Sequence, residues 1–121
     1  MTIQKVMAEV ESISPNAIDE GLKISWLNQM EETIYKEVIC THEGYEEIHP
    51  EQITMESDYE QELIAEDPYS KLYVFYLLSK IDFINHEWDS YNNTAEMFNQ
   101  AYKEYKAYYN RNHMPVQKVK R

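Results

Sequence analysis

Glycine and cysteine are scarce in this sequence. Only 2 of its 121 residues are glycine, a composition that disfavours glycine-rich phosphate loops and turn-rich all-β folds. Cys40 is the only cysteine, so the chain cannot form an internal disulfide, and we expect a reducing compartment. No apolar run is long enough to span a bilayer, and the first residues lack the apolar core of a signal peptide. These absences predict a soluble protein of the cytoplasm.

Basic residues are also few. The chain has 11 Lys and Arg against 22 Asp and Glu, which gives a net charge of −11. A nucleic-acid clamp needs a basic face that neutralises phosphates, and an anionic membrane surface attracts basic segments. The charge balance therefore argues against both kinds of partner. The length of 121 residues predicts a single domain.

Apolar and aromatic residues recur at three- and four-residue steps from position 67 onward, the spacing of a helix face. We expect a helical hairpin here. Its first helix would begin at Asp67-Pro68, and its second would be capped by Asn93 or Thr94 and end before Met114-Pro115. The aromatic and β-branched residues of 73–78 also suit a strand, but the length of the periodic pattern favours a helix. The first stripe consists of Tyr69, Leu72, Tyr73, Tyr76, Leu77, Ile81, Ile84 and Trp88. The second consists of Phe98, Ala101, Tyr102, Tyr105, Tyr108, Tyr109 and Asn112.

The first helix of this hairpin is apolar over most of its circumference. Such a helix must be covered on several sides, so we place it at the centre of the domain or between the domain and a neighbour. Tyrosine is enriched at protein interfaces, and this helix has more apolar surface than three partner helices readily cover. Tyr73, Phe75 and Tyr76 are therefore our candidates for an apolar interface.

Two helices precede the hairpin. A short one runs from Thr2 to Ile13 with Thr2 as its cap, and a longer one runs from about Asp19 to about Cys40. Their inner faces carry Ile3, Val6, Met7 and Val10 in the first helix and Trp26, Leu27, Met30, Ile34 and Val38 in the second. The predicted fold class is therefore all-α, a small antiparallel bundle of about four helices that forms one domain over residues 1–115.

Residues 41–66 lack helical periodicity and are strongly acidic. Ten of the 22 acidic residues fall between positions 43 and 67, and no Lys or Arg occurs between Lys36 and Lys71. We expect a long loop with a short extended piece, and one or two helical turns over Asp58 to Ala65. A loop of this length in a compact domain is usually functional or disordered.

The residue types that carry chemistry do not form a known constellation. His42, Glu43 and His49 invite a metal site, but the zincin spacing fails at Glu46 and the nearby Gly44 disfavours a helix. Asp89, Tyr91 and Asn93 only faintly resemble a calcium loop. Cys40 lacks an activating neighbour, since side chains two apart on a helix do not face each other. We therefore predict no enzyme activity, no metal and no cofactor.

Three phrases together cover most of the chain: ISWLNQMEETIYKEVICTHEG at 24–44, EDPYSKLYVFYLLSKIDFINHEWDSYNN at 66–93 and MFNQAYKEYKAYYNRNHMP at 97–115. They resemble the head-to-tail connector, or head-completion adaptor, proteins of tailed phages and prophages of Gram-positive bacteria. The most specific parts are DPY, YNN and YYNRNHMP. The resemblance implies a helical protein that forms a homo-oligomeric ring beneath the portal and extends the DNA channel. Its partners would be its own copies, the portal protein and tail-side adaptors, first in the host cytoplasm and then at the virion head–tail junction.

Within that role, two charged segments are candidate contact sites. An acidic surface facing a channel would repel duplex DNA, and we place Glu56, Asp58, Glu60 and Glu62 of the loop near the channel or a neighbouring subunit. The basic tail 116–121 would dock on a neighbour or on the portal. Its cations are Lys118, Lys120 and Arg121. The alternative function is a small acidic phage protein that binds and regulates a host protein.

Overall fold

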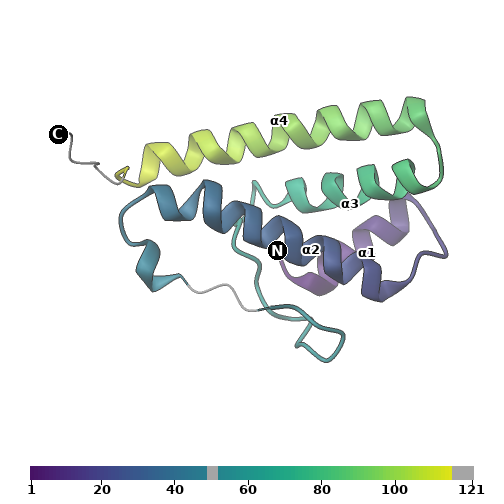
Figure 1. The fold of residues 1–121 in the computed structure, drawn as a ribbon, viewed down its shortest axis with the longest axis horizontal. Helices are drawn as coiled ribbons and strands as arrows, with labels where there is room; N and C mark the ends of the chain where they lie inside the picture. Colours follow the sequence, from purple (N-terminus) through teal and green to yellow (C-terminus); the bar gives the residue numbers. More distant parts are fainter. Residues whose placement is uncertain (49–51, 116–121) are drawn as a thin grey trace.

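The computed structural model describes residues 1–48 and 52–115 (Figure 1). The predicted all-α bundle is confirmed, because the described residues form four α-helices. These are α1 (Ile3–Ile13), α2 (Glu20–Glu37), α3 (Lys71–Ile84) and α4 (Trp88–Asn112). Two short 3₁₀ turns, Ile39–Thr41 and Tyr45–Glu47, follow α2. In Figure 1, α3 and α4 lie side by side as an antiparallel pair, and α1 and α2 lie beneath them.

Helix α3 occupies the centre of the bundle, one of the two positions that its wide apolar stripe predicted. It packs against α4 along its length and also against α1 and α2. Burial of its side chains on several faces follows from these three neighbours. The buried apolar residues of α3 are Leu72, Tyr73, Val74, Leu77, Leu78 and Ile81. The inner face of α4 adds the three buried tyrosines Tyr102, Tyr105 and Tyr109.

The two N-terminal helices agree with their periodic patterns. The Thr2 hydroxyl accepts a hydrogen bond from the Lys5 amide at 3.2 Å, so the predicted N-cap of α1 is present. All five residues predicted for the inner face of the second helix are buried, four on α2 and Val38 at its C-cap. Glu31 is also buried on that face, although the sequence interpretation did not include it.

The hairpin between α3 and α4 begins and turns at positions different from those predicted. Helix α3 starts at Lys71, after a turn that contains the cis Asp67-Pro68 peptide bond. His86 then takes a left-handed backbone conformation with φ of 57°, which ends the helical path. As a result Trp88 opens α4 instead of closing the first helix.

The predicted cap of the second helix has another role. The hydroxyls of Ser90 and Thr94 both donate to the Asp82 carboxylate, at 2.8 and 3.0 Å. Thr94 therefore lies inside α4 and ties it to α3. The Thr94 hydroxyl group, which the sequence offered as an N-cap, is thus used in a contact between two helices.

Residues 52–66, which we call the strap, pass the start of α1 and lie against α2 without regular secondary structure (Figure 1). The predicted helical turns over Asp58 to Ala65 are wrong. The strap instead runs antiparallel to the start of the chain, with a bridge between Thr2 and Glu62. The amide of Leu63 donates to the Met1 carbonyl at 3.1 Å, and the amide of Gln4 donates to Tyr59 at 2.8 Å. These backbone contacts take the hydrogen bonds that a local helix would have used.

Candidate functional site

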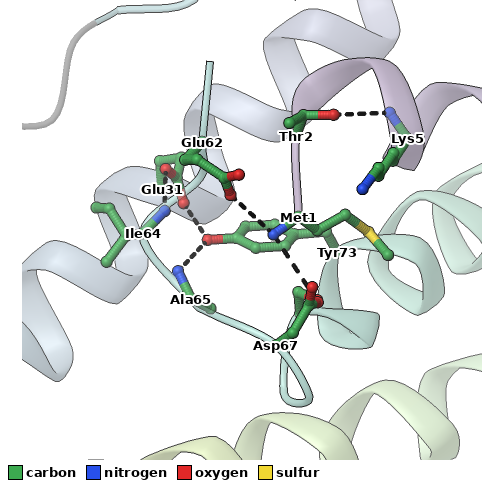
Figure 2. A network of polar contacts seen from close by, with 10 residues as sticks. Met1, Thr2, Lys5, Glu31, Glu62, Ile64, Ala65, Asp67 and Tyr73 are labelled. Carbon is green, nitrogen blue, oxygen red and sulfur yellow. Dashed lines mark hydrogen bonds and ion pairs between the residues drawn. The ribbon is translucent and has the colours of Figure 1, made fainter. Parts of the chain in front are cut away.

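The C-terminal end of the strap is fixed to the core through Tyr73 of α3 and Glu31 of α2 (Figure 2). The Tyr73 hydroxyl donates to one Glu31 carboxylate oxygen and accepts a hydrogen bond from the Ala65 amide at 2.8 Å. The other carboxylate oxygen accepts from the Ile64 amide at 3.0 Å. Two backbone amides of an irregular segment are thus satisfied inside the protein.

This arrangement corrects the prediction for Tyr73. Its side chain is fully buried, so it is not part of a surface that a partner reaches. The hydroxyl group explains the location: a tyrosine ring packs in a core when its polar end finds a partner there, and Glu31 and Ala65 supply one acceptor and one donor.

Burial sets the electrostatics of this pair. It raises the pKa of Glu31 above its usual value of 4.5, and the hydrogen bonds from Tyr73 and Ile64 oppose that rise. Burial, followed by the adjacent Glu31 charge, raises the pKa of Tyr73 well above 10.0. Tyr73 therefore stays a neutral donor throughout the ordinary pH range, whereas Glu31 is the group of this network whose protonation changes as the solution is acidified.

A second anchor holds the N-terminal part of the strap. The Asn28 side-chain amide donates to the Ile53 carbonyl, and its oxygen accepts from the Ile53 amide, both at 2.7 Å. The Ile53 side chain is itself buried in the core. The strap is consequently attached to α2 at two separated positions, one near each of its ends.

Between these anchors the predicted acidic residues project outward. Glu56, Asp58, Glu60 and Glu62 are all exposed. The turn that carries Glu56 is closed by hydrogen bonds between Thr54 and Ser57. Of the four acids, only Glu62 has an ion-pair partner in the part of the chain that the structure describes, the Met1 ammonium at 3.0 Å (Figure 2). The predicted tail cations Lys118, Lys120 and Arg121 lie outside the described residues.

Phe75 and Tyr76, the other two candidates for an apolar interface, lie half-buried on opposite flanks of the α3–α4 pair. Phe75 lines an open groove of about 570 Å³ together with Met97 and Ala101 of α4. Tyr76 lies against Phe98 with ring centroids 5.2 Å apart, beside a smaller hollow of about 350 Å³. Both residues thus remain at the surface, on two different faces.

An exposed aromatic cluster at the α3–α4 turn escaped the sequence interpretation. Phe83, Ile84 and Trp88 are 53, 43 and 50% exposed, and the Phe83 and Trp88 rings meet edge to face at 5.5 Å. Ile84 and Trp88 belong to the apolar stripe that the spacing predicts for the first hairpin helix, which we expected at the centre of the domain or against a neighbour. Because the chain turns at His86, they instead lie at the junction of α3 and α4 with about half of their surface exposed. Adjacent exposed apolar side chains of this kind are typical of binding surfaces.

His42 also differs from its predicted setting in a solvated acidic loop. It is buried, with Nδ1 2.6 Å from the Val38 carbonyl oxygen and Nε2 2.6 Å from the Asn110 side-chain oxygen. Its ring meets Tyr109 edge to face with centroids 4.8 Å apart, and the His113 ring stacks on Tyr109 at 3.7 Å. His42 therefore joins the end of α2 to the end of α4 as a structural residue.

No group of His, Cys, Asp and Glu within 1–48 and 52–115 has the arrangement of a metal site. Cys40 is half-buried. None of the described helices combines the length and the apolar character that a membrane crossing requires. Comparison with protein-family models, with curated proteins and with solved structures finds no match to this chain.

Proposed function

We propose that this chain is a head-to-tail connector adaptor of a tailed phage or prophage, which assembles as a ring under the portal and extends the DNA channel. The observation that carries the proposal is the strap. Two anchors on α2 hold it, and its acids Glu56, Asp58 and Glu60 point outward without ion-pair partners among the described residues. A fixed array of negative charge repels duplex DNA and keeps a channel wall from binding it.

Two further features support an assembly role. A ring is built from head-to-tail contacts, so each subunit needs two different adhesive patches. The aromatic cluster at the α3–α4 turn and the groove beside Phe75 are two apolar surfaces on different parts of the hairpin. The phrases DPY, YNN and YYNRNHMP, which carry the resemblance to connector proteins, belong to this same hairpin: they precede α3, fall in the first turns of α4 and close α4.

Negative-stain electron microscopy tests the proposal with the full chain, alone and mixed with the portal encoded in the same genome. We expect class averages viewed down the axis to contain added rings or a lengthened portal. A portal that stays bare, with no ring at high protein concentration, would overturn the connector function. It would direct the search to a host protein, the alternative suggested by the acidic composition.

The acidic strap is tested in the same assay by changing Glu56, Asp58 and Glu60 to Lys together. Because these three side chains are exposed and have no ion-pair partner among the described residues, the fold should persist, which circular dichroism checks. We expect portal decoration to be lost, or rings to form that bind DNA. Unchanged assembly with no DNA binding would remove the strap from the proposal.

A further inference from the structure

The groove beside Phe75 has an apolar floor and acidic edges. Phe75 of α3 and Met97 and Ala101 of α4 form the floor, and Met97 is 48% exposed. Glu96 and Glu104 line the same groove, lie eight residues apart on α4, and are therefore separated by about 12 Å along the helix axis. Neither forms an ion pair within the described residues. The groove is thus suited to an extended segment that carries both apolar and basic side chains.

The chain itself contains one such segment. Residues 116–121 read VQKVKR, with two valines, three cations and no acid. From Lys118 to Lys120 an extended chain spans about 7 Å, and the long lysine side chains extend this reach toward the two groove carboxylates. Successive side chains of an extended segment point to opposite faces, which lets a valine meet the apolar floor while the neighbouring lysines reach the acidic edges.

The chain leaves α4 on a side that does not face the groove. Pro115 bridges to His42, and His42 contacts Asn110, which lies about 120° round the helix from Glu104.

We propose that the groove formed by Phe75, Glu96, Met97, Ala101 and Glu104 binds residues 116–121 of a second copy of the chain. The contact would join two different surfaces. The groove supplies an apolar floor and two carboxylates, and the tail of the second copy supplies valines and cations. Such a heterologous contact is the kind that builds rings. This inference rests on the proposed function for the identity of the partner, since ring neighbours supply the second tail. The binding itself requires neither portal nor ring.

Fluorescence anisotropy with a labelled peptide of residues 113–121 tests the contact. The receptor is the full chain in which Lys118, Lys120 and Arg121 are changed to Glu, so that its own tail does not compete. At low ionic strength we expect saturable binding that weakens as salt screens the charges. Adding Glu96→Lys and Glu104→Lys to the receptor should weaken binding by about tenfold or more, because like charges then face each other. A peptide with Glu at the three cationic positions should regain affinity for the reversed groove, measured in a receptor that keeps its own basic tail so that this tail does not compete.

The matched control is Glu43→Lys with Glu46→Lys, which makes the same charge change at two exposed acids that do not line the groove. We expect the control to retain affinity within about threefold, since only long-range charge is altered. The inference would be overturned if the peptide bound to no receptor. It would also be overturned if the control variant lost affinity for the peptide while the groove variant kept it. Lysine is a good helix former, so circular dichroism should report an intact fold. Peptide binding without portal decoration would reject the connector function alone, and portal decoration without peptide binding would reject this contact alone.

Discussion

Replacing Tyr73 with Phe removes one oxygen atom from the centre of the bundle and leaves the ring in place. The hydroxyl group bonds Glu31 and the Ala65 amide, so the substitution leaves one carboxylate oxygen and one buried amide without partners. The apolar packing of α3 is unchanged. The experiment therefore isolates the polar anchor of the strap from the hydrophobic core around it.

The expected magnitude follows from the two lost hydrogen bonds. A bond to a charged group is worth about 1.5–3 kcal/mol, and a buried donor without a partner costs about 1–3 kcal/mol. Because the two effects share one site and the strap relaxes, we expect a total loss of about 2–4 kcal/mol. Such a loss is a large part of the free energy of unfolding of a whole domain, which is about 5–15 kcal/mol. A change of this size should lower the melting temperature by about 10 °C.

Urea unfolding at a series of pH values gives a second, sharper test. A carboxyl group with a raised pKa in the folded state binds more protons there than in the unfolded state, so stability falls as pH rises from 4.5 through the folded pKa. Without the Tyr73 donor the pKa of Glu31 rises further. The deficit of the variant should therefore be smallest near pH 4.5 and grow toward neutral pH.

Tyr76→Phe is the matched control, because its exposed hydroxyl group lies 3.4 Å from Gln29 and leaves nothing buried unpaired. We expect that control to change the free energy of unfolding by less than about 0.5 kcal/mol. A Tyr73→Phe loss equally small, or one that does not vary with pH, would refute the assignment of Glu31 and Tyr73 as the anchor of the strap.

Two other substitutions address the same anchors. Glu31→Gln removes the titrating group. In the parent chain, burial of this carboxyl group should make stability decline between pH 4.5 and neutral pH, and urea unfolding of the variant should lack this decline. An unchanged pH profile would show that Glu31 is not the source of the decline. Asn28→Ala removes both bonds to Ile53 and should lower stability by about 1–3 kcal/mol. Amide exchange should rise at Ile53 in this variant, and protection equal to the parent would show that the apolar contacts of Ile53 alone hold the strap.

The helices could be predicted wherever the determining forces are local. The cap at Thr2 and the inner face of α2 depend on residues three or four apart, and the sequence displays both. The buried tyrosines Tyr102, Tyr105 and Tyr109 of α4 follow from the same spacing. The central place of α3 was also predictable, because its apolar residues extend round most of the helix.

The turn between α3 and α4 could not be placed in this way. Ile81, Ile84 and Trp88 continue the helical spacing across it, and no Gly or Pro interrupts them. The chain turns through His86 in a left-handed conformation, which non-glycine residues adopt uncommonly. The spacing therefore predicts Ile84 and Trp88 on one continuous helix face and does not reveal that they form an exposed cluster with Phe83. The only sign of a break in the sequence is the length of the pattern. From Tyr69 to Trp88 it covers more than five helical turns before the predicted cap at Asn93.

The Glu31–Tyr73 pair was hidden for another reason: the two residues lie 42 positions apart. A partial signal exists, since Glu31 lies four residues after Leu27 and three before Ile34, both on the buried face of α2. An acid in that stripe predicts a buried polar partner. The tyrosine-rich helix α3 offers several candidates, and only the fold selects Tyr73 among them.

An apolar pair could not replace Glu31 and Tyr73 as the anchor of the strap. Replacing a buried ionic or polar network with hydrophobic residues often maintains or increases stability, but here the network satisfies the backbone amides of Ile64 and Ala65. The strap has no regular secondary structure to provide partners for these amides, so an apolar substitute would leave both unpaired. Glu31 and Tyr73 thus do for an irregular segment what a neighbouring strand does in a sheet. They fix the position of the strap, and with it the position of the charges that the proposed channel wall requires.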